Sequence, residues 1–293
     1  PDSVLAHILI AATYPLEVVQ AARWTEKNPQ MKGESATQAV DDKPWDPSIK
    51  ALVAVPTILQ RMSSDLDWLQ QLGSAVFDNE EQLAVRIQSL RQSAYDEGNL
   101  DSLEHMRVVH EEETIIIEPT VREIVYLPYY DSRYIYGSWR WASYPPVYWY
   151  HPFHNRHHRY RTSIFWGPSI HLNWGFFFGG FHWHDHHIRV IDRHRYADRR
   201  YYSSRQIARH RDARRWHHNP RHRRSVHYHN NRAREQFRHK VRSPKKHLKP
   251  HQLKRRGEYN ERDRIAIRNK ALKQEKGRNK SHEKGHRAKQ LER

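Results

Sequence analysis

The sequence predicts an α+β protein: an N-terminal helical bundle with a small β element, then an aromatic and glycine-rich extension and a largely disordered basic tail. Apolar residues recur at helical spacing to about residue 100. β-branched runs bounded by proline follow between 106 and 136. Arg, His and Lys dominate after residue 187. We therefore expect an acidic module at 1–137, an aromatic, Gly- and His-rich extension at 138–187, and a basic tail at 188–293.

Helix start and break signals divide the bundle into segments. Asp or Ser before an apolar run caps a helix start, and proline suits the first turn of a helix but breaks its interior. These signals predict a first helix capped by Asp2-Ser3, a break at Tyr14-Pro15, a second helix to about Trp24, a short helix or loop over 32–43, a third helix from Asp46-Pro47 bent at Pro56, and two more over 66–77 and 83–94.

The β element is predicted as a hairpin. Arg107–Val109 and Thr114–Ile117 flank an acidic turn, and Ile124–Leu127 is expected to add a third strand. The order of elements then predicts a small sheet packed on the helices.

Charge divides the chain into two unlike halves at Gly137. The first half holds 11 Lys and Arg residues against 22 Asp and Glu, and the remainder holds 40 against 11. Of the 24 histidines, 21 also follow Gly137. This asymmetry is typical of a folded acidic module followed by a basic interaction region. Within that region, Glu258–Lys276 is expected as an isolated charged helix.

Several classes of protein are excluded by composition. The chain has no cysteine, so it has no disulfide, zinc ribbon or catalytic thiol. No run approaches the ~18–20 apolar residues that a membrane span needs, so we expect no transmembrane span. No signal peptide is visible, but the chain opens at Pro1 without an initiator Met. We therefore expect that an upstream segment is missing.

Four stretches resemble one bacterial family. They are PDSVLAHILIAATYPLEVVQAARW (1–24), KPWDPSIKALVAVPTILQRMSSDLDWLQQLG (43–73), IIIEPTVREIVYLPYYDSRYIYGSW (115–139) and WHHNPRHRRSVHYHN (216–230). They are similar to the domain of unknown function 3300 family, and the last looks like its C-terminal motif, built around HNPxHRxxVxY. The resemblance covers nearly all of 1–150 and a patch at 216–237.

The resemblance implies a location rather than an activity. Members of this family look like exported proteins of Gram-negative bacteria with a signal or lipoprotein leader, which places this chain in the periplasm or outer envelope. The family brings no established activity. This sequence departs from the usual glycine-rich middle by its density of His and Arg.

A histidine cluster is the sharpest chemical candidate. On a strand, His182, His184 and His186 would share one face, where three imidazoles suit Zn²⁺, Cu²⁺ or Ni²⁺. Asp185 would orient a ligand or bind from the other face. The competing interpretation is that histidine is simply abundant here and that no physiological metal is bound.

Basic residues interleaved with rings indicate a binding surface for polyanions. Arg and Lys supply phosphate contacts, and Tyr, Trp and His supply stacking. The expected partners are anionic envelope polymers or lipid head groups, and nucleic acid is disfavoured because no reader motif is present. A solvated tail without a dedicated ligand is the alternative. The candidate contacts are Arg214, Arg215, Arg221, Arg223 and Arg224.

These observations rank the possible functions. The leading hypothesis is a non-enzymatic cell-envelope protein, acting as a scaffold or binding module for anionic surface polymer. A metal-binding or metal-buffering envelope protein comes second, and a nucleic-acid-binding protein third. No nucleophile motif or acidic pair accompanies the histidines of Trp216–Tyr228, so we expect no enzyme. We interpret that stretch as a docking element that folds back onto the aromatic region.

Overall fold

The computed structural model describes residues 1–101, 103–139, 141–146, 164–172, 178–192, 203–229 and 231–241. For residues 238–241 it describes the backbone only. The chain forms two compact units, Pro1–Val241 and Arg242–Arg293. The second unit, which includes the helix expected at 258–276, lies outside the described residues. The limits expected at 137 and 187 stay predictions; within Pro1–Val241, described segments after both limits pack on the helices.

The chain is a mixed α+β protein, as predicted. Residues 1–101 contain seven helices: α1 (Asp2–Ala12), α2 (Pro15–Lys27), α3 (Gly33–Ala39), α4 (Pro47–Leu52), α5 (Pro56–Ser64), α6 (Leu66–Asp78) and α7 (Glu80–Asp96). The helix start at Asp46 is confirmed, since its carboxylate accepts the Ser48 N–H at 2.9 Å. Pro56 begins a separate helix where a bend was expected.

The expected cap at Asp2 is wrong. Asp2 is already the first residue of α1, and no side chain caps this helix. Its buried carboxylate instead pairs with the Arg91 guanidinium and accepts the indole N–H of Trp183 at 2.7 Å. One carboxylate thus ties α1 to α7 and to a residue far along the chain.

The described strands are short, and further helices follow the first hairpin. The strands are β1 (Met106–Glu111), β2 (Thr114–Pro119), β3 (Ile124–Val125), β4 (Pro128–Tyr129), β5 (Phe165–Trp166), β6 (Ile170–His171), β7 (Gly179–His182), β8 (His187–Val190) and β9 (Arg214–Arg215). The later helices are α8 (Ser132–Ile135), α10 (Ser204–Arg209), α11 (Pro220–Arg223) and α12 (Asn231–Val241).

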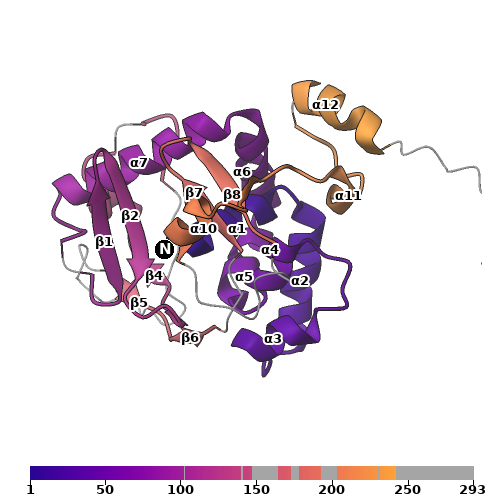
Figure 1. Cartoon of the computed structure of the whole chain (residues 1–293), viewed down its shortest axis with the longest axis horizontal. Coiled ribbons are helices and arrows are strands. Elements are labelled where there is room, and N and C mark those ends of the chain that lie inside the picture. Colours follow the sequence, from indigo (N-terminus) through magenta and orange to yellow (C-terminus); the bar gives the residue numbers. More distant parts are fainter. Residues whose placement is uncertain are drawn as a thin grey trace, which may run out of the picture. The chain divides into compact units, whose positions relative to one another are not determined.

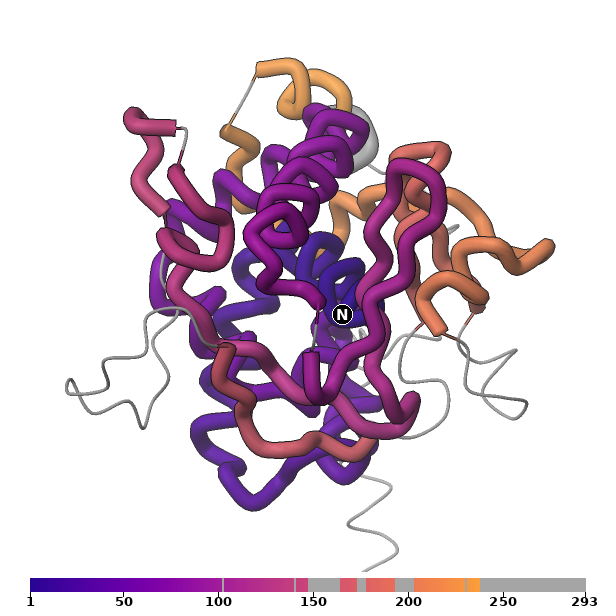
Figure 2. Tube along the Cα trace, turned by 90° about the vertical axis from the view of Figure 1, so that its left-hand side faces the viewer, coloured from indigo at the N-terminus to yellow at the C-terminus, as the bar shows by residue number. Residues whose placement is uncertain are grey.

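The predicted hairpin is confirmed, and the predicted third strand is wrong. β1 and β2 pair antiparallel, with Met106 opposite Pro119 and Glu111 opposite Thr114. Ile124 and Val125 do not extend this hairpin; they form β3, which pairs with β6, while β4 pairs with β5. Short strands of the extension therefore occupy the positions beside β3 and β4. In Figure 2 the hairpin runs beside α7, whose Gln88 side chain hydrogen-bonds both backbone groups of Ile115.

The core is built around α1. This helix packs against α2, α4 and α6 and against strand β7, which crosses in front of it in Figure 1. Its apolar residues are almost all buried. Gly73 of α6 permits the closest approach, because a Cβ there would lie 2.2 Å from the Ala12 carbonyl oxygen. A helix covered on so many sides must be apolar nearly all round.

Much of the tail that was expected to be disordered is ordered. β7, β8 and β9 form a three-stranded antiparallel sheet, and α10 packs on β7 and β8. Ile207 of α10 is fully buried, and Tyr228 and Phe237 are largely buried. The disorder prediction is therefore wrong for 188–192, 203–229 and 231–241, where few apolar residues are supplemented by buried polar contacts.

Within the described residues, no single helix is long and apolar enough to span a membrane. Taken together, α1 and α2 have the length and hydropathy of a membrane span, but they meet at a bend of 116°.

Candidate polyanion-binding surface and its buried anchor

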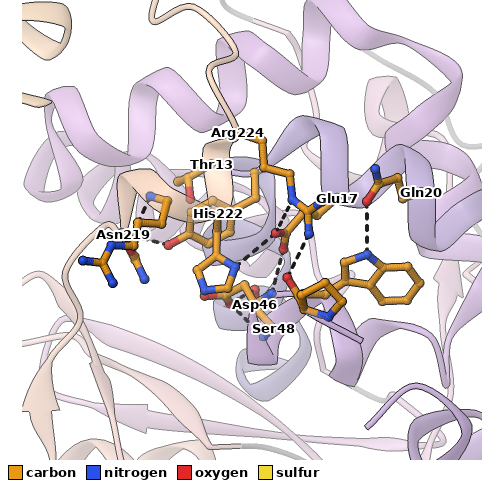
Figure 3. A network of polar contacts seen from close by, with 12 residues as sticks. Thr13, Glu17, Gln20, Asp46, Ser48, Asn219, His222 and Arg224 are labelled. Carbon is orange, nitrogen blue, oxygen red and sulfur yellow. Dashed lines mark hydrogen bonds and ion pairs between the residues drawn. The ribbon is translucent and has the colours of Figure 1, made fainter. Parts of the chain in front are cut away.

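The C-terminal motif returns to the first two helices and is held there by one buried carboxylate (Figure 3). Glu17 of α2 is fully buried. Its Oε2 accepts the Asp46 N–H at 2.7 Å. Its Oε1 lies 3.1 Å from Nδ1 of His222 and 3.2 Å from Nε of Arg224. We call these four residues the Glu17 anchor.

Charge compensation explains how the anchor tolerates burial. The hydrogen bond with Glu17 raises the pKa of His222, which favours the imidazolium that can neutralise the carboxylate. Burial raises the pKa of Asp46, although hydrogen bonds from Ser48 oppose this change. The anchor thus places acidic groups of the N-terminal helices against cations of the C-terminal motif. Removing one partner from such a cluster leaves a buried charge uncompensated.

Arg223, the residue before Arg224, is also used inside the fold. Its side chain is only 1% exposed. The guanidinium donates to the carbonyl oxygens of Thr13, Val226 and His227 at 2.8 to 3.0 Å. It also lies over the ring of Tyr228, with its central carbon 4.4 Å from the ring centroid. Arg223 therefore completes the C-terminal end of α1 and fixes the shape of its own loop.

Aromatic contacts complete the docking of the motif. His218 stacks on Tyr14 at 5.1 Å between centroids, and its Nε2 lies 2.9 Å from the Tyr228 hydroxyl. The Asn219 N–H donates to the Tyr14 hydroxyl at 3.0 Å. Phe77 of α6 contacts His218 and Tyr228. Within the described residues, the predicted docking element folds back onto α1, α2 and α6; much of the aromatic region onto which it was expected to fold lies outside those residues.

A second glutamate joins the β7–β8–β9 sheet to helix α7. Glu80, the first residue of α7, accepts the Ile188 N–H through Oε1 at 2.6 Å. Its Oε2 accepts a hydrogen bond from Nη2 of Arg215 at 3.0 Å. β8 and β9 are therefore both fixed to the start of α7, where the helix dipole also favours an acidic side chain.

Between these attachments the chain forms a basic hollow beside the β1–β2 hairpin. Its volume is about 650 Å³. Glu118 is its buried acidic residue and pairs with Arg107 at 2.7 Å. Residues of the hairpin, of the turn at 120–123 and of the α10 segment line the hollow. We call it the arginine hollow, and its basic residues are Arg107, Arg122, Arg205, Arg209, Arg211 and His210.

The hollow keeps an excess of positive charge. Glu118 neutralises Arg107, and Glu111 pairs with both Arg205 and Arg209. With Asp212, which pairs with Arg211, three carboxylates stand against five guanidinium groups. Arg122 is exposed, and the Arg211 side chain is 90% exposed and lies 3.9 Å from Asp212. Several guanidinium groups around one open hollow suit a ligand with repeated phosphate or carboxylate groups.

The predicted polyanion contacts divide into two groups. Arg214 and Arg215 lie exposed on β9, and Arg221 is exposed on α11. Arg223 cannot reach a polymer because it is buried, so this choice is corrected. Arg224 is engaged by Glu17 and by the Pro44 carbonyl oxygen. The predicted residues thus do not form one surface.

The predicted metal residues do not share a strand face. His182 ends β7, and 183–186 form the turn before β8, with a positive φ of 55° at His186. The strand alternation that would have aligned the three imidazoles is therefore wrong. His182 instead pairs with Asp185 at 3.1 Å. In the part of the chain that the structure describes, no group of three or more His, Asp or Glu side chains is placed to hold a metal ion.

Sequence reasoning missed the arginine hollow, although one local signal was present. Ser203 and Gln206 form a capping box at the start of α10, and this pattern marks a helix start. A helix there places Arg205 and Arg209 on one face, four residues apart. Their convergence with Arg107 and Arg122 depends on long-range packing, which the local pattern does not contain.

Comparisons with known proteins identify the family. The family described as "Protein of unknown function (DUF3300)" matches residues 1–218, so the match ends within the C-terminal motif and before His222 and Arg224. The "Uncharacterized protein YacH" of Escherichia coli (strain K12) is 33% identical over 180 residues, which cover 50% of this chain and 29% of that protein. The chain thus spans less than a third of that relative. No solved structure matches. The chain belongs to the DUF3300 family.

Proposed function

We propose that this chain is a non-enzymatic binding module of the cell envelope that holds an anionic surface polymer in the arginine hollow. The observation that carries the proposal is the convergence of Arg107, Arg122, Arg205, Arg209 and Arg211 around one open volume. The envelope location is the expectation raised by the family resemblance, and it is part of the proposal.

The residues of the hollow favour an extended anion over a small neutral ligand. A guanidinium offers a planar pair of donors that matches carboxylate and phosphate geometry. Glu111 shows that one carboxylate can be shared here by two guanidinium groups, since one of its oxygens contacts Arg205 and the other contacts Arg209. A polymer anion would take the place of Glu111 on these two arginines and would meet Arg122 and Arg211 at the exposed side.

The burial of Glu17 argues against a catalytic role for the anchor. Glu17 is fully buried and both of its oxygens are engaged. A general acid or base must reach the proton that it transfers, and a substrate has no access to this carboxylate. We therefore assign the Glu17 anchor to the fold and the arginine hollow to binding.

The test compares two double variants of the full chain. Arg122→Gln/Arg211→Gln removes two exposed cations of the hollow. Arg214→Gln/Arg234→Gln removes two exposed cations outside it, so the net charge and the basic residues 242–293 stay matched. The probe is purified lipopolysaccharide, titrated by fluorescence anisotropy at several salt concentrations. We expect about tenfold weaker binding for the hollow variant and less than about twofold for its control.

Three further results decide between the hypotheses. Affinity for the polymer should fall steeply with salt and survive His182/His184/His186→Ala, because imidazoles have no part in it. Equal losses in both double variants would contradict the hollow and leave only general charge attraction. Tighter binding of single-stranded DNA than of lipopolysaccharide, together with recovery of the full-length protein in the cytoplasm on fractionation, would replace the envelope proposal with a nucleic-acid function.

A further inference from the structure

An apolar cavity is lined by Met106 and Ile117 of the hairpin, whereas Arg107 and Glu118 of the same hairpin line the arginine hollow. Its volume is about 490 Å³, within the range of about 300–1,000 Å³ that is usual for ligand pockets. Helices α1, α5, α7 and α8 and strands β1, β2, β4 and β5 all contribute to its wall. Most of its wall residues are apolar; the aliphatic ones include Val4, Leu5, Ile8, Ile58, Ile87 and Leu90.

The exposure of these wall residues indicates an occupant. Leu5 and Ile8 of α1 and Ile87 and Leu90 of α7 lie at core-facing helical spacing, yet all four are only half-buried. An empty apolar cavity destabilises a fold in proportion to its volume. Apolar cavities do not hold ordered water and readily take up apolar ligands. The cavity therefore suits a hydrocarbon ligand.

Four polar side chains interrupt the apolar wall: Arg91, Tyr130, Ser132 and Tyr136. The hydroxyls of Tyr130 and Tyr136 lie 2.8 Å apart. Burial and the neighbouring Tyr130 raise the pKa of Tyr136, while the nearby Arg91 opposes this change. Arg91 itself pairs with Asp2 and donates to the Ile115 carbonyl oxygen, so its charge is compensated. Tyr130, Tyr136 and Arg91 thus form one polar region of the wall.

The hydroxyl pair leaves one hydrogen for a ligand. Each hydroxyl carries one O–H, and their mutual hydrogen bond uses one of the two. The other O–H can donate to a carbonyl or carboxylate oxygen inside the cavity. A molecule that fills the aliphatic volume and accepts this hydrogen bond has a long hydrocarbon chain with a carbonyl head.

We propose that the cavity binds a fatty acyl chain, with its carbonyl head accepting a hydrogen bond from the Tyr130–Tyr136 pair. This site is separate from the arginine hollow, and the two proposals stand or fall independently. The compensated charge of Arg91 means that binding should depend on the hydrocarbon chain first and on the head second.

The first test is titration of the full chain with a fluorescent fatty acid, followed by displacement with unlabelled oleate. We expect saturable binding of one molecule per chain. Leu90→Trp fills the cavity from the α7 wall and should weaken binding at least about tenfold. Val85→Trp is the matched control, because Val85 lies on the same helix, is 50% exposed and is not part of the wall.

A second variant keeps the test informative if Leu90→Trp fails to fold. Tyr130→Phe/Tyr136→Phe retains both rings and removes both hydroxyls, because either hydroxyl alone would still offer an O–H to the ligand. It should weaken oleate binding by about three- to tenfold, the usual effect of one hydrogen bond. It should leave the binding of a hydrocarbon probe without a carbonyl, such as pyrene, unchanged. An equal effect on both probes would contradict the assigned head position.

Three outcomes overturn the proposal. Binding that is the same in wild type, Leu90→Trp and Val85→Trp would place the fatty acid elsewhere. Wild-type chain that binds no fatty acid, while a variant with Gly and Ser in place of residues 147–150 does, would show that the chain itself occupies the cavity. The absence of binding in every variant would likewise reject a fatty acyl ligand.

Discussion

The helices of residues 2–96 and the segment 203–229 belong to one compact unit, but different forces hold them. The helices bury aliphatic side chains in a continuous core around α1. The segment 203–229 contributes few apolar residues and is fixed by charged groups, chiefly Arg223, Arg224 and His222 against the first two helices and Arg215 against Glu80. A basic, polar stretch can therefore fold when its cations meet preplaced carbonyls and carboxylates.

The contrast extends to arginines within the same segment. Arg223 is buried and donates only to protein groups, whereas Arg211 is almost fully exposed beside an open hollow. Nothing in residue type separates them. Position relative to α1 decides which arginine supports the fold and which remains available to a ligand.

The largest expected effect comes from removing the buried guanidinium. Arg223→Met keeps much of the side-chain volume but leaves the carbonyls of Thr13, Val226 and His227 without their donor. We expect a loss of about 3–5 kcal/mol in the free energy of unfolding, measured by urea titration. Arg214→Met, on exposed β9, should change it by less than about 0.5 kcal/mol. Equal small effects would mean that the segment is held by its apolar residues after all.

Local sequence signals predicted the first half of the fold well for a physical reason. Asp46 caps its helix, Asp65 accepts the Trp68 N–H, and Pro15 starts α2, all through contacts within a few residues. One exception was Asp2, whose partners Arg91 and Trp183 are remote in sequence. The local sequence predicted that the Asp2 carboxylate caps a helix, whereas in the folded chain it binds side chains that are distant in sequence.

An intermediate effect is expected where α10 meets the sheet. A Cβ at Gly180 would lie 2.2 Å from the Ser204 carbonyl oxygen, so α10 would have to move. Gly180→Ala should therefore cost about 1–3 kcal/mol of unfolding free energy. Gly179→Ala, whose Cβ would meet ordinary contacts at 3.6–3.7 Å, is the matched control.

The readout for Gly180→Ala is hydrogen exchange of the α10 amides in addition to urea unfolding. Faster exchange in α10, with the helices of residues 2–96 unchanged, would show that the second half opens separately from the first. Uniform loss of protection would show instead that the two regions unfold as one unit. A result indistinguishable from Gly179→Ala would contradict the close approach.

The candidate sites were harder to predict than the fold because each depends on convergence. The sequence indicated that arginines after residue 200 matter, but the hollow also needs Arg107 and Arg122 from the hairpin side. The histidines at 182–186 were predicted to align because a strand was assumed across them. The strand ends at His182 and residues 183–186 form a turn, so His184 and His186 do not share a strand face with His182.

The smallest expected effect is a pH dependence of the Glu17 anchor. The hydrogen bond with Glu17 raises the pKa of His222 in the folded state. Its contribution to stability is therefore complete below the unfolded value of about 6.5 and is lost as the pH rises through the folded value. Since His222 is partly exposed, we expect a loss of less than about 1 kcal/mol.

His222→Asn isolates this titration, because the amide can donate to Glu17 without changing charge. Of the charged groups facing His222, Arg224 contacts the same carboxylate oxygen of Glu17, and burial raises the pKa of Asp46. Burial lowers the pKa of His182, so its titration falls below pH 6.5 and acts in the opposite direction. Urea unfolding from pH 6.5 upward should thus slope downward in the wild type and be flatter in His222→Asn. Identical slopes would mean that the carboxylate is neutralised by Arg224 alone, and that the histidine serves the anchor only as a hydrogen-bond donor.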